Sequence, residues 1–186
     1  MALAIDVAAE SERLDSKKPY VELINGIEVP KVSPRLRHAL LQTEIAVIVH
    51  AWAKSQQGVV VTEARFWLDI DPKTATSLLP DVAFVSSGRL RGLSDEDQQR
   101  PAFAPDLAIE VRSPSDRNRN IALKIERYLE LGARLVLDVD PQLRVIVAHD
   151  GKATRVFASG EIVEHPEMPG LRLDVDAMMK AGDPPN

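Results

Sequence analysis

The sequence contains no cysteine among its 186 residues. This absence excludes disulfide bridges and thiolate-ligated metal sites, and it favours a cytosolic (cytoplasmic) protein, because disulfides belong to oxidising compartments. No apolar run approaches the roughly 20 residues that a membrane-spanning helix needs. Aromatic residues make up only 4% of the chain. That leaves few platforms on which a sugar ring can stack, which disfavours a two-carboxylate glycosidase.

A surplus of basic residues is also missing. The chain has 23 Lys and Arg against 28 Asp and Glu, for a net charge of -5, which disfavours a general nucleic-acid binder. It does not exclude a nuclease, because a metal-binding carboxylate cluster contributes negative charge of its own. One short segment is locally basic, and it is either a nucleic-acid contact or a solvated helix start. Its members are Arg112, Arg117, Arg119, Lys124 and Arg127.

Glycine-rich phosphate loops and nucleophile elbows are absent, which disfavours an NTPase or a serine hydrolase. With 45% hydrophobic residues, the chain is long enough to bury a sizeable core in one domain. We expect residues 1–18 to form a polar, weakly structured lead-in. Residues 19–186 then form the single domain.

The pattern of apolar residues predicts alternating strands and helices. Tyr20–Val29 reads as a hairpin around Asn25-Gly26, a pair that tolerates positive φ. A helix is expected from about Arg35 to Lys54, a β-rich run over residues 59–70, and a polar loop over residues 86–105. Near the C-terminus we expect a strand around Arg155, an extended segment at 168–174 and a short final helix.

The middle of the chain predicts a parallel crossover. A helix is expected from about Arg117 to Leu131, capped by Ser115 or Asp116 and stopped by Gly132. A strand in residues 105–112 precedes this helix, and two more strands follow it, at residues 134–139 and 143–148. The predicted class is therefore α/β (α+β), with a mixed β-sheet flanked by helices and an N-terminal β-hairpin.

Two carboxylates stand beside short apolar runs. Asp81 precedes one run, in residues 80–85, and Glu110 lies within another, in residues 105–112. Because side chains alternate along a strand, Glu110 and Arg112 share the face opposite the apolar residues. Two carboxylates on neighbouring strands, with a cation beside them, have the composition of a divalent-metal site next to a phosphate. The pattern therefore favours a metal-dependent nuclease.

Lys124 interrupts an apolar helix stripe. Ile121, Ile125, Tyr128 and Leu129 form this stripe, and Lys124 falls inside it. A lysine there loses hydration unless its ammonium reaches water or a partner. It therefore either extends to solvent or turns back toward the carboxylates of the sheet.

These segments resemble the Uma-two family, a restriction-endonuclease-like branch of the PD-(D/E)XK nuclease superfamily. The resemblance runs from about Tyr20 to Met179. Its most specific part is the run from Glu110 to Asp116, with a lysine downstream. The other matching pieces, in the order of the family, are residues 20–26, His38 with Glu44, residues 79–85, Lys124, Tyr128, Gly132, residues 137–141 and residues 169–174.

The resemblance implies a restriction-endonuclease-like core and a metal-dependent phosphodiesterase site that acts on DNA. By position, Asp81 matches the acid of the Pro-Asp element, Glu110 the acid of the (D/E)XK element, and Lys124 the lysine on the following helix. Glu44 matches the helix glutamate that completes such sites. We expect Asp81, Glu110 and the carbonyl of Val111 to hold Mg²⁺ or Mn²⁺.

Lys124 is then expected to orient the attacking water or to help deprotonate it, with its pKa lowered by burial. A homodimer is expected by analogy, because cutting two strands takes two sites. Arg112 departs from the pattern, since the simplest motif has lysine two residues after the acid. Arginine can stabilise phosphate charge but cannot act as a base, so either Arg112 or Lys124 fills the lysine role.

Two further side chains and one rival function remain open. Glu63 either adds a third carboxylate or points to solvent. His38 either bonds near the site or caps or packs a helix. The rival function is a non-catalytic domain that keeps the nuclease scaffold and binds nucleic acid or a protein partner.

Overall fold

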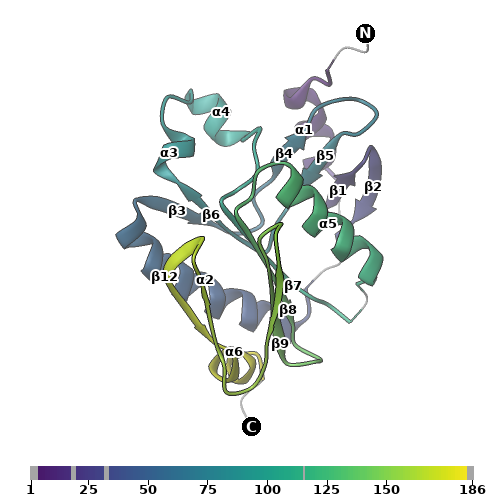
Figure 1. Ribbon diagram of the computed structural model, residues 1–186. Helices are drawn as coiled ribbons and strands as arrows, with labels where there is room; N and C mark the ends of the chain where they lie inside the picture. The colour runs from purple at the N-terminus through teal and green to yellow at the C-terminus, as the bar shows by residue number, and fades with distance from the viewer. Residues whose placement is uncertain (1–3, 18–19, 32–33, 115, 184–186) are drawn as a thin grey trace.

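A six-stranded mixed sheet forms the centre of the molecule (Figure 1). The computed structural model describes residues 4–17, 20–31, 34–114 and 116–183. Strand order is β10-β9-β8-β7-β6-β3, and β7 and β8 are parallel while the other neighbours are antiparallel. The strands are β3 (Gly58–Val61), β6 (Val82–Ser86), β7 (Leu107–Val111), β8 (Leu135–Asp140), β9 (Val145–His149) and β10 (Thr154–Phe157).

Helices cover both faces of this sheet. Helix α2 (Leu36–Gln56) packs Leu41, Ile45 and Val49 against alternate residues of the central strands, together with β12 and α6. Helix α5 (Asn118–Glu130) packs on the opposite face with a second, four-stranded sheet. The second sheet contains β1 (Val21–Ile24), β2 (Ile27–Pro30), β4 (Phe66–Asp69) and β5 (Thr76–Leu78). Further along the chain are β11 (Ile162–His165), β12 (Met168–Asp174) and α6 (Val175–Ala181).

This architecture confirms the predicted class of a mixed sheet flanked by helices. The N-terminal hairpin is also confirmed, because Val21–Ile24 pairs with Ile27–Pro30 around Asn25 and Gly26. Both turn residues have positive φ, 52° and 74°, as a two-residue hairpin turn requires. Strands β7 and β8 are buried along their whole length, which explains their nearly continuous apolar sequence.

The expectation of a weakly structured lead-in is wrong for part of residues 1–18. Val7–Asp15 forms helix α1, which Asp6 caps by accepting from the amides of Ala8 and Ala9. Leu14 is fully buried, and Ser11 accepts a 2.8 Å hydrogen bond from the indole of Trp67. Tertiary packing therefore stabilises a helix too short to be stable alone.

Other local expectations also need correction. The polar segment 86–105 contains two short helices, α3 (Ser87–Leu90) and α4 (Asp95–Gln99). The run 59–70 is divided between β3 and β4, which belong to different sheets. Asp116 does not cap α5, since its carboxylate accepts from the Ser113 amide, and Ser115 lies outside the described residues. Within the described ranges, no helix has the length and apolarity to cross a membrane.

Candidate active site

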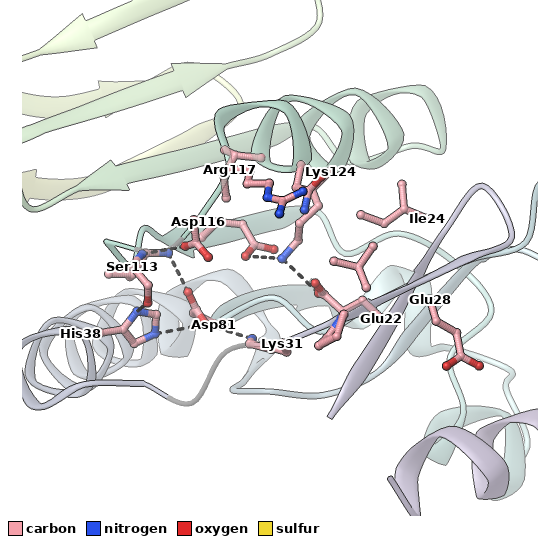
Figure 2. Close-up of a pocket in the computed structure, with 16 residues that line it drawn as sticks. Glu22, Ile24, Glu28, Lys31, His38, Asp81, Ser113, Asp116, Arg117 and Lys124 are labelled. Atoms are coloured by element: carbon pink, nitrogen blue, oxygen red, sulfur yellow. Dashed lines mark hydrogen bonds and ion pairs between the residues drawn. The ribbon is translucent and has the colours of Figure 1, made fainter. Parts of the chain in front are cut away.

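A cavity of about 450 Å³ opens where the ends of β6 and β7 meet the hairpin and the starts of α2 and α5. Its position follows from the register, because Val82 pairs with Ile109 and so places Asp81 beside Glu110. Figure 2 shows charged side chains converging here from separate elements. The ionisable residues of its wall are Glu22, Glu28, Lys31, His38, Asp81, Glu110, Asp116, Arg117 and Lys124.

Asp81 is buried immediately before β6, and each of its two carboxylate oxygens accepts a hydrogen bond. Its Oδ2 accepts a 2.6 Å bond from the Val111 amide, and its Oδ1 lies 3.0 Å from the Lys31 ammonium. Burial by itself raises the pKa of a carboxyl group, but the charge of Lys31 and the contact with His38 outweigh it. The pKa of Asp81 is therefore lowered well below its usual range, and the group stays ionised.

Glu110 lies on β7, on the sheet face that α5 covers. Its Oε2 accepts a 2.6 Å bond from Lys124, and its Oε1 accepts a 2.9 Å bond from the Tyr128 hydroxyl. Burial raises the pKa of Glu110 to about 7, because Lys124 offsets only part of the lost hydration and the charges of Asp81 and Glu22 add repulsion. The surroundings of Glu110 therefore disfavour its ionised form.

Lys124 turns back from α5 into the cavity, and its ammonium lies between two carboxylates (Figure 2). It lies 2.6 Å from Glu110 and 3.0 Å from Glu22. The expectation of a lowered pKa is wrong. Burial does lower the pKa of Lys124, but the adjacent charges of Glu110 and Glu22 outweigh it, so the pKa is raised. At neutral pH this side chain is an ammonium that donates hydrogen bonds.

Glu22 and Lys31 were missed by the sequence analysis. Glu22 is 3% exposed and accepts a 2.9 Å bond from the Leu79 amide. The only sign of its role in the sequence is that Glu22 is an acid within the otherwise apolar strand 20–24. A side chain pointing outward to solvent would explain that pattern equally well. Lys31 follows β2 in an irregular segment, where no periodicity indicates the direction of a side chain. Its charge faces Asp81 only through tertiary structure.

His38 lies beside Asp81 at the start of α2 (Figure 2). Its Nε2 is 3.4 Å from Asp81 Oδ1, and its Nδ1 is 3.3 Å from the Ser113 hydroxyl. Burial lowers the pKa of His38, yet the carboxylate of Asp81 raises it by more. The buried Nε2 makes no hydrogen bond with the described residues. The nearest polar partner of Nε2 is thus Asp81, and His38 lies beside the candidate metal-binding acid.

Arg112 and Glu44 do not line the cavity, although both were candidates for the site. Arg112 makes a two-pronged pair with Asp138, at 2.7 and 2.6 Å. Lys124 is thus the one of the two alternative cations that reaches Glu110. Glu63 lies next to the site, because its carboxylate is 2.9 Å from Lys31.

The donor atoms at this site suit a hard divalent cation. Asp81 and Glu110 offer carboxylate oxygens, and each oxygen accepting a single bond keeps a second lone pair. No group of three or more His, Cys, Asp or Glu side chains in the described part of the chain is arranged to hold a metal. Mg²⁺ characteristically uses one or two carboxylates and keeps several waters. A divalent cation beside Glu110 would also stabilise its ionised form, because a nearby opposite charge favours that form.

The comparisons with known proteins agree with the fold. Residues 8–176 match the Uma2 family, described as "Putative restriction endonuclease". A similar solved structure is that of a putative nuclease belonging to DUF820 from Anabaena variabilis ATCC 29413. It is 21% identical, with a TM-score of 0.82 over 96% of this chain and 99% of that chain.

No curated protein matches the sequence. The match to the family extends from within helix α1 to the start of α6 and includes every cavity residue named above. The fold similarity independently spans nearly the whole length of both chains. The chain therefore belongs to the Uma2 family of putative restriction endonucleases.

Proposed function

We propose that this protein is a Mg²⁺- or Mn²⁺-dependent endonuclease that hydrolyses phosphodiester bonds in DNA. The observation that carries the proposal is the convergence of Asp81, Glu110 and the Lys124 ammonium on one cavity. When bound, the metal would neutralise charge on the phosphoryl oxygens and make a water molecule more acidic. Asp81, Glu110 and the carbonyl of Val111 are the groups proposed to hold it.

The protein's own residues divide the remaining tasks. Lys124 is proposed to orient the attacking water or a phosphoryl oxygen as a charged donor, and not to accept a proton. Arg117 is exposed, lines the cavity and precedes α5. It is proposed to contact the phosphate backbone, while His38 is proposed to hold Asp81 in place from the start of α2.

Most of the basic segment is engaged within the protein itself. Arg127 lies 2.9 Å from Asp69 and 3.1 Å from Glu130, while Arg112 is bound to Asp138. Arg117 and Arg119 are exposed. We therefore propose that the DNA contact at this edge is narrow, and that it depends on the cavity more than on a broad basic surface.

The direct test is cleavage of plasmid, linear and single-stranded DNA by purified protein across a Mn²⁺ series. Asp81→Ala and Glu110→Ala should each lower the rate by at least ~10²-fold, because each removes a major electrostatic stabiliser. Asp106→Asn is a matched control, since Asp106 is equally buried but binds Ser86 and Arg89 away from the cavity. Cleavage by Asp81→Ala or Glu110→Ala at the rate of the wild type would reject the mechanism.

The rival function is a non-catalytic nuclease scaffold that binds nucleic acid or a protein partner. It is favoured by one observation: both carboxylates already have partners within the protein on all four oxygens. Thermal unfolding with and without Mn²⁺ separates the two. A metal at 100 times its Kd stabilises the folded state by ~2.7 kcal/mol, and Asp81→Ala should abolish that shift. No shift in the wild type favours the scaffold.

We also propose that the active form is a homodimer, because breaking both strands of a duplex takes two sites. In that case linear product should appear without a long-lived nicked intermediate. Light scattering at the enzyme concentrations of the assay gives the oligomeric state independently.

A further inference from the structure

Lys31 is held in a cage of three oxygen atoms. Its ammonium donates at 2.6 Å to the Leu79 carbonyl and at 3.0 Å to Asp81 Oδ1, and it lies 2.9 Å from Glu63 Oε2. An ammonium has three protons, so these contacts use its full donor capacity. The Lys31 amide bonds to the Tyr20 carbonyl at 2.7 Å, which fixes the backbone from which the side chain extends.

The cage is itself held in place. Gln42 donates from one amide nitrogen to Glu63 Oε1 at 3.1 Å and to the Asp81 carbonyl at 3.0 Å. Glu63 also adopts a left-handed backbone with φ of 54°, a conformation that costs free energy in a residue other than glycine. Its amide bonds to the Pro80 carbonyl. Two distant loops are therefore aligned so that a carbonyl and two carboxylates surround one cation.

Such a set of ligands has the chemistry of a divalent-metal position. Hard cations such as Mg²⁺ and Mn²⁺ bind carboxylate and carbonyl oxygens and complete their shell with water. Lys124 differs from Lys31 in the number of oxygen atoms around its ammonium. The Lys124 ammonium has two carboxylate partners, Glu110 and Glu22, and so keeps one proton for a ligand in the cavity.

We infer that Lys31 is a built-in cation that occupies a divalent-metal position formed by the Leu79 carbonyl, Asp81 and Glu63. The wild type would then bind one exchangeable divalent ion, at Asp81 and Glu110. A variant without the Lys31 ammonium would bind two, the second at the position that Lys31 vacates. This count rests on the proposed function, because the exchangeable ion is the one assigned there. Lys31 is on this view a positioning residue that neutralises Asp81 without leaving the site.

The experiment counts Mn²⁺ bound to metal-free protein by calorimetric titration and electron paramagnetic resonance. Wild type should bind one ion and Lys31→Ala two. Lys31→Ala/Glu63→Gln should return to one, because it removes a carboxylate of the cage. Lys31→Arg should also bind one, since it keeps the positive charge. Lys152→Ala, which removes an exposed lysine, should match the wild type.

Thermal unfolding covers the case in which Lys31→Ala folds poorly, since it leaves the buried Asp81 without its ammonium. Its melting temperature should fall in EDTA, and Mn²⁺ should raise it by more than it raises the wild type. A variant that stays unfolded in saturating Mn²⁺ overturns the inference. So does a count for Lys31→Ala equal to that of the wild type, or a count of two ions for the wild type.

The two proposals fail in different ways. If the wild type binds no ion while Lys31→Ala binds one, the metal site of the proposed function is rejected and the exchange at Lys31 stands. If the wild type binds one ion that Asp81→Ala abolishes, and Lys31→Ala adds none, the proposed function stands and the role of Lys31 is rejected.

Discussion

Two carboxylates lie opposite each other on the parallel strands β7 and β8, and they have contrasting surroundings. Glu110 and Asp138 are register partners, and both are almost completely buried. Arg112 binds both oxygens of Asp138 as a planar fork, which leaves that carboxylate little capacity for another ligand. Glu110 shares the single ammonium of Lys124 with Glu22, and burial raises its pKa because that ammonium offsets only part of the lost hydration.

The contrast shows that the type of cation separates a structural pair from a candidate catalytic one. The arginine fork satisfies a carboxylate completely and holds the ends of two strands together. The lysine leaves its carboxylate electrostatically unsatisfied at the wall of a cavity, and such groups are characteristic of functional sites. The predictions below test this difference from its largest expected effect to its smallest.

The largest difference should appear in DNA cleavage. Lys124→Met should lower the single-turnover rate by at least ~10²-fold, because it removes the charged donor of the cavity. Arg112→Met should cost less than about tenfold, which corresponds to ~1.4 kcal/mol of barrier. Rates of plasmid cleavage under identical Mn²⁺ check this. Equal losses in the two variants would show that both cations serve the reaction.

The second difference is in the pH dependence of stability. Folded Glu110 has a pKa of about 7 against a reference value of 4.5. The folded state binds the Glu110 proton more tightly than the unfolded state does. Glu110 therefore makes its full contribution to the free energy of unfolding below pH 4.5. That contribution is lost as pH rises through about 7. We expect the loss to be about 3 kcal/mol once the pH is well above 7.

Urea unfolding of metal-free protein across this pH range gives the measurement. Glu110→Gln should lack the loss, so its stability relative to the wild type should rise with pH. Asp138→Asn is the control, because it leaves Glu110 and its surroundings in place. If the free energy of unfolding of Glu110→Gln changes with pH in parallel with that of the wild type, Glu110 does not have the raised pKa.

A third prediction concerns the arginine pair. Arg112→Ala should lower the free energy of unfolding by about 1 to 2 kcal/mol, because it removes charged hydrogen bonds from the buried Asp138. The expected loss of stability is small because the Arg112 side chain is 26% exposed and solvent screens its charge. Arg119→Ala, which changes an exposed arginine nearby, should alter stability by less than ~0.5 kcal/mol. Chemical denaturation of both variants at neutral pH tests the difference.

The smallest effect is expected at Glu44. Its side chain lies on α2 but does not line the cavity, in contrast to the role that the family resemblance suggests. Glu44→Gln should therefore change the cleavage rate by no more than about twofold, or ~0.5 kcal/mol of barrier. A loss comparable to that of Lys124→Met would restore Glu44 to the catalytic set.

Elements with strong local signals were predictable. The Asn25-Gly26 pair indicated the hairpin, and alternation along residues 105–112 separated the face of Glu110 from the face of Ile109. The apolar stripe of α5 identified Lys124 as an anomaly, because a lysine among buried positions needs a partner. Helix α1 was not predictable, because it is stabilised by the burial of Leu14 against the four-stranded sheet, which lies outside the local sequence.

Periodicity and motif spacing were enough to identify the class of fold, the two central carboxylates and the lysine of the following helix, because each of these depends on neighbours close in the chain. The tertiary structure decided the rest. Glu22 enters the site because the hairpin packs beside β5. Arg112 leaves it because Asp138 lies on the adjacent strand. Lys31 meets Asp81 only when segments 50 residues apart fold together, and electrostatic contacts at that separation follow from packing and have no local pattern.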